Sequence, residues 1–107
     1  MAESGIKLLT LKPVEVTTPG TAVPLPTLEG LFAAKTVIVQ ALSTNEEPVV
    51  VGDSKVKAKA GAHGSTEQQG IELAAKATVA FEINDTAQIY VDARKAKDGV
   101  AVTVLIA

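Results

Sequence analysis

The sequence has no cysteine and no tryptophan, and its aromatic residues are limited to Phe32, Phe81 and Tyr90. The lack of cysteine excludes disulfide bridges, thiolate metal sites and a cysteine nucleophile. Although 47% of the residues are apolar, very few of them are aromatic. The core therefore has to be built from Val, Ile, Leu and Ala. Such a core is thin, and we therefore expect partner subunits to help stabilise it.

Long apolar runs are also missing. None approaches the roughly 20 residues needed to span a bilayer, and residues 1–5 lack the basic start and apolar centre of a signal peptide. We therefore expect no membrane partner and synthesis in the cytoplasm. The net charge of -2 gives no reason to expect nucleic-acid binding. The basic cluster at residues 94–97 has no interleaved aromatic residues and is interpreted as a solvated loop tip.

Histidine occurs once, at His63. A single imidazole cannot form a His-based zinc site. A set of Ser65, His63 and Asp53 has the right residue types for nucleophilic catalysis, but no nucleophile-elbow motif surrounds the serine. We therefore expect neither an enzyme nor a cofactor.

Four aspartates fall at predicted strand ends and turns. Calcium sites take oxygen ligands from such loops, but Asp is also common in turns because it bonds to nearby backbone groups. We favour the turn interpretation for Asp53, Asp85, Asp92 and Asp98.

The clearest pattern lies in residues 77–106. Apolar and polar residues alternate in 77–83, 87–93 and 100–106, which is the period of a half-buried strand. Asn84-Asp85 and Asp98-Gly99 lie between these runs and suit tight reversals. The pattern predicts three consecutive antiparallel strands.

Further strands are predicted at Lys35 to Leu42, Val49 to Val51, Lys55 to Ala60 and Ile71 to Leu73. Short strands at this spacing, without a long helix, predict an all-β antiparallel sandwich or jelly-roll-like barrel of about seven to eight strands over residues 35–107. Its predicted core comprises Val37, Val39, Val50, Leu73, Val79, Phe81, Ile83, Ile89, Val91, Val102 and Val104.

Lysine alternates with small apolar residues in the run from Lys55 to Ala60. As a strand, this run places Lys55, Lys57 and Lys59 on one face. In one interpretation, these lysines lie on an edge strand and discourage edge-to-edge pairing with another sheet. In the alternative interpretation, they form a contact surface for an acidic partner.

Residues 1–34 predict an extended N-terminal arm or edge segment. Pro13, Pro19, Pro24 and Pro26 remove donors that a central strand needs. Val14 to Val16 alternates once and suits a short added strand, and residues 27–34 suit one helical turn. Leucines are frequent, so we expect the arm to bury them on a partner. The predicted partner-binding residues are Leu8, Leu9, Leu11, Val14, Val16, Leu25, Leu28 and Phe32, together with the three lysines.

Three runs carry a resemblance to a known group. Val49 to Val56 reads VVVGDSKV, Gly70 to Leu73 reads GIEL, and Ile89 to Ala93 reads IYVDA. This order resembles small β-rich virion proteins of tailed double-stranded DNA bacteriophages, which serve as decoration, cement or fibre proteins on the head. The loop at 61–70 and the arm at 1–34 depart from the usual pattern.

The resemblance implies a decoration or cement protein that binds the outer capsid surface and bridges capsid subunits. It implies the major capsid protein as partner, a homo-oligomer (dimer or trimer), and a place in the virion after synthesis in the host bacterial cytoplasm. The alternative is a tail or baseplate module that attaches to a host surface glycan. Few aromatic residues are available to stack on sugars, which counts against this alternative.

Overall fold

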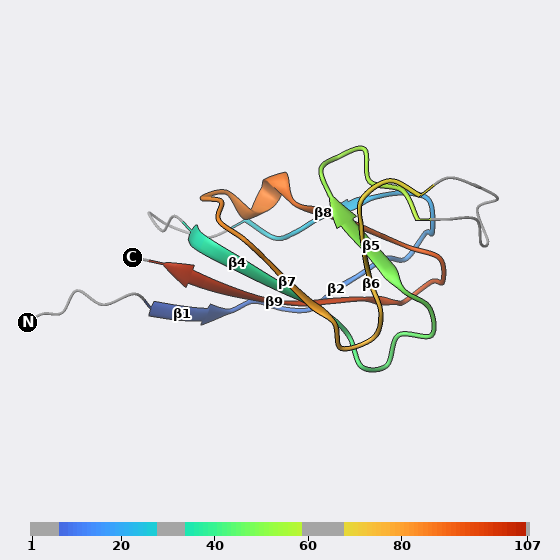
Figure 1. Cartoon of the computed structure of the whole chain (residues 1–107), viewed down its shortest axis with the longest axis horizontal. Coiled ribbons are helices and arrows are strands. Elements are labelled where there is room, and N and C mark those ends of the chain that lie inside the picture. Colours follow the sequence, from blue (N-terminus) through green and yellow to red (C-terminus); the bar gives the residue numbers. More distant parts are fainter. Residues whose placement is uncertain (1–6, 28–33, 59–67, 107) are drawn as a thin grey trace, which may run out of the picture.

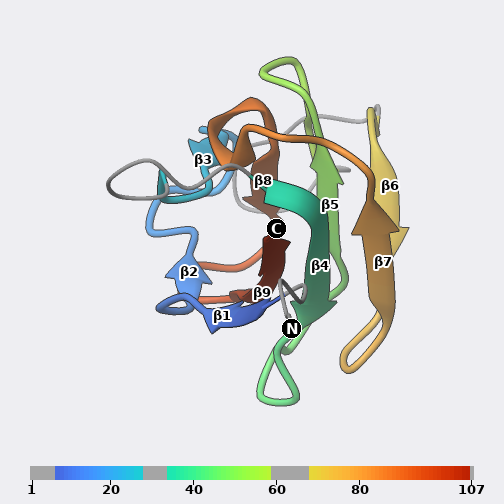
Figure 2. The same ribbon diagram turned by 90° about the vertical axis from the view of Figure 1, so that its left-hand side faces the viewer.

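A computed structural model describes residues 7–27, 34–58 and 68–106 of the chain. Two antiparallel sheets pack on each other as a β-sandwich (Figures 1 and 2). The all-β sandwich is therefore confirmed, whereas the jelly-roll variant stays a prediction. A single 3₁₀ turn, η1 (Thr86–Gln88), interrupts the strands of the described residues.

The first sheet, called sheet A, is built around the two longest strands. β4 and β9 each contain 8 residues and pair with each other along most of that length. β7 lies on the other side of β4, while β1 and β2 both pair with the free side of β9. The strands of sheet A are β1 (Lys7–Thr10), β2 (Val14–Glu15), β4 (Ala34–Ala41), β7 (Thr78–Phe81) and β9 (Gly99–Ile106).

The second sheet, called sheet B, is shorter and has the order β3-β8-β5-β6. Its strands are β3 (Val23–Pro24), β5 (Val49–Gly52), β6 (Ile71–Leu73) and β8 (Tyr90–Ala93). The β-branched run at the start of β5 explains why this segment forms a central strand. Figure 2 shows β6 and β7, the edge strands of the two sheets, on the same side of the sandwich.

The main core lies between the two sheets. Of the predicted core residues, it contains Val37, Val39, Leu73, Ile89, Val91, Val102 and Val104. Val50 is buried as predicted, but it belongs to a separate cluster with Val56 and Ala58. Val79, Phe81 and Ile83 are half-buried against the main core, because β7 is an edge strand.

The connections among β7, β8 and β9 differ from the predicted hairpins. β7 and β9 belong to sheet A, whereas β8 belongs to sheet B, so both connections cross between the sheets. The side chain of Asp85 caps η1 by accepting a hydrogen bond of 3.0 Å from the N–H of Ala87. Asp98 is buried and accepts hydrogen bonds from a different loop. The polar dipeptides therefore mark chain crossings and not reversals within one sheet.

The predicted boundary between an arm and a domain at residue 34 also needs correction. Residues 7–27 supply three strands of the sandwich, β1 and β2 on sheet A and β3 on sheet B. The prolines fit this arrangement because they occupy edge positions: Pro13 lies between β1 and β2, and Pro24 lies in edge strand β3. Residues 7–27 thus contribute strands at the edges of both sheets. The helical turn predicted for 27–34 falls mainly on residues 28–33, outside the described residues.

The predicted lysine strand is wrong for residues 55–58. Lys57 forms an isolated bridge with Gln69, in which each N–H donates to the other carbonyl at 2.8 Å, and residues 55–58 belong to none of the described strands. The Asp53 side chain accepts the N–H of Lys55 at 2.9 Å and turns the chain there. The predicted alternation of faces is nevertheless confirmed in this stretch, since the lysines are exposed while Val56 and Ala58 are buried.

Candidate functional site

The structure separates the predicted partner-binding residues into four groups. Val14, Val16 and Leu25 are buried in the chain's own core, so these side chains are not available to a partner. Leu9 and Leu11 are half-buried against that core. Leu8 is 67% exposed. Lys55 and Lys57 are exposed as well. Leu28, Phe32 and Lys59 lie outside the described residues.

Edge strand β1 presents Leu8 together with unpaired backbone groups. The N–H of Leu11 donates to the carbonyl of Val102 at 3.0 Å, just beyond the register in which Leu9 lies opposite Val104. Hydrogen-bonded pairs alternate along an antiparallel ladder. The N–H and C=O groups of Leu8 and Thr10 therefore point away from β9, and no strand within the described residues pairs with that edge.

The position of β1 makes this edge accessible. Figure 1 shows β1 and the adjoining ends of β4 and β9 reaching past the strands of sheet B along the long axis of the molecule. An open edge of this kind accepts an extended strand from another chain through main-chain hydrogen bonds. The apolar residues of this segment are evident in the sequence, but the consecutive Leu8 and Leu9 obscure the strand period that would indicate an edge strand.

The run IYVDA, at Ile89 to Ala93, contains a buried aspartate. Asp92 is fully buried on the outer side of sheet B, opposite the core positions Val91 and Ala93. Its carboxylate accepts hydrogen bonds from the N–H groups of Gly20 at 2.9 Å, Ala58 at 2.8 Å and Ala93 at 2.9 Å. The predicted turn role is therefore wrong for Asp92, which connects two loops to β8.

Tyr90 belongs to the same outer side of sheet B. Its side chain packs against the cluster of Val50, Val56 and Ala58 and is half-buried. Phe81 is half-buried against the main core. Neither ring lies free on the surface as a stacking platform for a sugar, and Phe32 is outside the described residues. The glycan-binding alternative thus gains no support from these two rings.

The charged loops at one end of the sandwich bind each other. Arg94 pairs with Glu47 at 3.3 Å, and Lys95 pairs with Glu46 at 2.9 Å. The hydrogen bond and the negative charge of Glu46 raise the pKa of the Lys95 ammonium above its ordinary value of 10.5. Much of the positive charge of residues 94–97 is therefore compensated within the chain, which leaves little to attract an anionic partner.

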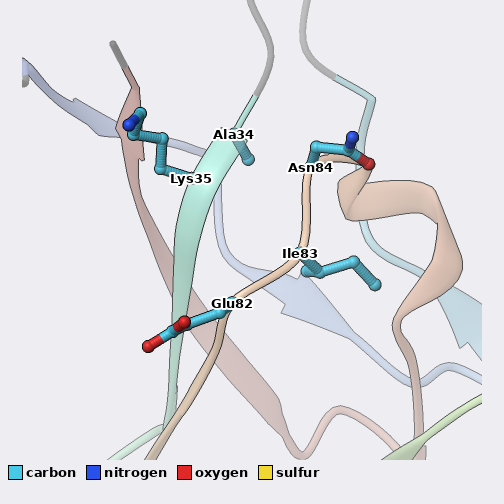
Figure 3. A pocket seen from close by; sticks show the side chains of 5 residues that line it. All are labelled: Ala34, Lys35, Glu82, Ile83 and Asn84. Carbon is cyan, nitrogen blue, oxygen red and sulfur yellow. The ribbon is translucent and has the colours of Figure 1, made fainter.

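An open pocket of about 380 Å³ lies where β4 begins and the segment after β7 ends. It is lined by Ala34, Lys35, Glu82, Ile83 and Asn84 (Figure 3). The lining offers an ammonium, a carboxylate and an amide, but no nucleophile next to a base. Across the described ranges, no group of at least three His, Cys, Asp or Glu side chains is arranged to hold a metal ion.

Comparisons with family models, with curated proteins and with solved structures give no match for this chain. Within the part of the chain that the structure describes, no helix has the length and apolar character required to cross a membrane. The candidate site is therefore defined by the geometry of edge strand β1.

Proposed function

We propose that this chain is a virion structural protein of a tailed bacteriophage, a decoration or cement protein that binds the outer head surface and bridges capsid subunits. Two features support this function. The first is the resemblance carried by VVVGDSKV, GIEL and IYVDA. The second, and the observation that carries the proposal, is the open edge of β1 with its exposed Leu8.

The mode of attachment is strand addition. An extended segment of the major capsid protein pairs with the free N–H and C=O groups of Leu8 and Thr10, and a side chain of the added strand packs beside Leu8 on the same face of the sheet. Each such hydrogen bond contributes about 1 kcal/mol net, and the cross-strand contact with Leu8 contributes up to about 1 kcal/mol. A single contact of this size is weak. A homo-oligomer that offers the edge more than once gains affinity through effective concentration.

The exposed lysines supply a second, salt-sensitive contribution. Lys55 and Lys57 are exposed, and within residues 55–58 they lie on no described strand that would need edge protection, so the contact role with an acidic capsid surface is favoured. Replacing Lys55, Lys57 and Lys59 with Gln should weaken head binding most at low ionic strength. Unchanged binding at every salt concentration would remove the lysines from the contact.

The location of the protein on the virion is tested by electron microscopy of virions that carry the labelled full-length protein. Label on the outer head surface is the expected result. Label confined to the tail tip or baseplate would contradict the proposal and favour adhesion to a host.

The attachment mode is tested separately with Leu8→Pro and Leu8→Ala. Proline removes the Leu8 N–H, which points to the open edge, and leaves the β1–β9 hydrogen bonds in place. We expect head binding to weaken at least about tenfold for Leu8→Pro, and less for Leu8→Ala, which keeps the donor. Circular dichroism controls for folding. Equal binding by Leu8→Pro and the wild type would exclude strand addition at β1.

A further inference from the structure

The outer face that β1, β9, β4 and β7 form in sheet A carries no charged side chain on its regular strand positions. The exposed Glu15 of β2, which lies opposite Gly99, borders this face. Residues alternate between the two faces of a strand, and the valines of β4 and β9 face the core. In surfaces of soluble domains, about three residues in ten are charged, so this composition is unusual. The outward positions are Leu8, Thr10, Thr36, Ile38, Gln40, Thr78, Ala80, Ala101, Thr103 and Leu105.

The strand register joins these side chains into one continuous surface. Leu105 lies opposite Leu8 on one side and Thr36 on the other. One row further along, Ile38 lies between Thr103 and Ala80. Because neighbouring strands are about 4.8 Å apart, side chains in each row touch and form a flat face of leucine, isoleucine, threonine and alanine.

The opposite side of the sandwich is different. There, Val56 and Ala58 cover Val50, and Asp92 holds the covering loop through the N–H of Ala58. The chain thus covers the part of the outer side of sheet B around Val50 with its own residues, while Glu72 of β6 is exposed there. On sheet A, Ile38, Thr103 and Leu105 remain half-exposed, and Leu8, Thr10 and Ala80 are exposed.

We propose that the outer face of sheet A packs against the same face of a second copy of the chain, forming a symmetric dimer. A face without charge meets its own copy without like-charge repulsion, whereas a charged partner finds nothing there to recognise. Two such faces pack as aligned sheets about 10 Å apart, as the layers of a sandwich do. Isologous packing of this kind closes at two subunits.

The size of the face fits a weak, reversible dimer. The eight residues of β4 and of β9 extend about 27 Å, the four residues of β1 and of β7 extend about 13 Å, and neighbouring strands are about 4.8 Å apart. Each copy therefore contributes about 400 Å², or about 800 Å² in total, which is the size of a weak interface. Lys35 and Glu82 stand at one end of the face, and Figure 3 shows both pointing away from Ile83. Their charges suit the polar rim of an interface.

The proposal is tested by sedimentation of the purified full-length protein, without capsids, from about 1 to 500 μM. We expect a monomer–dimer equilibrium with a midpoint in the micromolar range, because the buried area is small. Thr103→Lys and Thr103→Glu place an unpaired charge at the centre of the face and should each weaken the dimer at least about 30-fold. Thr17→Lys, at an exposed position on the β2–β3 connection, is the matched control and should dimerise like the wild type.

Mixing the Thr103→Lys and Thr103→Glu proteins shows whether the face contacts itself. We expect the mixture to associate at least about tenfold more tightly than either variant alone, because opposite charges then meet across the two-fold axis. A wild-type monomer at every concentration, a trimer, undiminished association of Thr103→Lys, or a mixture no tighter than its components would each overturn the proposal. Since no capsid is present, these results are independent of the proposed function.

Discussion

The side-chain amide of Asn45 forms two hydrogen bonds with the backbone of Gly99. Its Nδ2 donates to the Gly99 carbonyl at 2.9 Å, and its Oδ1 accepts the Gly99 N–H at 2.8 Å. Next to it, the Asp98 carboxylate accepts the N–H groups of Glu46 at 3.0 Å and Glu47 at 2.9 Å. These hydrogen bonds fix the loop that contains Asn45 to the start of β9, although Asn45 and Gly99 are 54 residues apart in the sequence.

Gly99 itself should not tolerate a side chain. A Cβ at this position would lie 2.0 Å from the carbonyl oxygen of Val14, because β2 passes directly over it. We expect Gly99→Ala to lower the free energy of unfolding by about 3 kcal/mol or more, measured by urea denaturation. Gly52→Ala is the control, since its Cβ would meet Val56 only at 3.5 Å, and should cost about 1 kcal/mol or less. Equal losses in the two variants would contradict the close approach of β2.

Removal of the Asp92 carboxylate should release two loops from sheet B. Asp92→Ala leaves the N–H groups of Gly20 and Ala58 without their acceptor, and we expect a loss of about 3 kcal/mol or more in the free energy of unfolding. Asp85→Ala, which removes the exposed cap of η1, should cost about 1 kcal/mol. If Asp92→Ala were the milder variant, Asp92 would not be the anchor that the hydrogen bonds indicate.

Two leucines of the N-terminal segment should lose very different amounts of stability on the same substitution. Leu25 is 2% exposed and Leu8 is 67% exposed. We expect Leu25→Ala to lower the free energy of unfolding by about 2–4 kcal/mol and Leu8→Ala by less than about 0.5 kcal/mol.

Deleting residues 1–27 should abolish the folded circular-dichroism spectrum, because Val14, Val16 and Leu25 are part of the core. A folded truncation would show that these strands are dispensable.

Lys95 should titrate above pH 10.5 in the folded protein, because the Glu46 partner raises its pKa. The ion pair therefore stabilises the fold below the ordinary pKa of lysine, and this contribution disappears as pH rises through the higher folded value. The effect is small, because the pair is exposed and screened by solvent. NMR titration of the Lys95 side chain should show a lower pKa in Glu46→Gln. The same pKa in both proteins would exclude the ion pair in solution.

Residue alternation predicted the positions of β4 and β9 well, because the period of a strand depends on local burial. The β-branched run at residues 49–51 predicted β5. Neither pattern predicted which strands are neighbours. The Asp98-Gly99 pair has the composition of a hairpin turn. In the structure, however, the Asp98 carboxylate accepts a hydrogen bond from the loop that contains Glu47, and Gly99 lacks the side chain that would collide with β2. Those partners are distant in the sequence, so the local pattern contains no information about them.

The candidate site was only partly predictable for a related reason. Leucines among prolines indicate that apolar side chains need a surface to cover them, but not which chain provides it. The structure assigns Leu25 to the chain's own core and leaves Leu8 exposed. The uncharged outer face of β1, β9, β4 and β7 could not be recognised in the sequence, because its members become one surface only when these four strands are aligned.

The place of β9 between β1 and β4 has a consequence for biosynthesis. Lys7 pairs with Ile106, and Val37 pairs with Val104, so the central strand of sheet A is translated after the strands on both of its sides. Until residues 99–106 leave the ribosome, those strands have no common neighbour to pair with. Topologies dominated by such distant pairings fold slowly, in milliseconds to seconds. During that interval the nascent chain exposes its apolar strands, which favours aggregation and creates a need for chaperones.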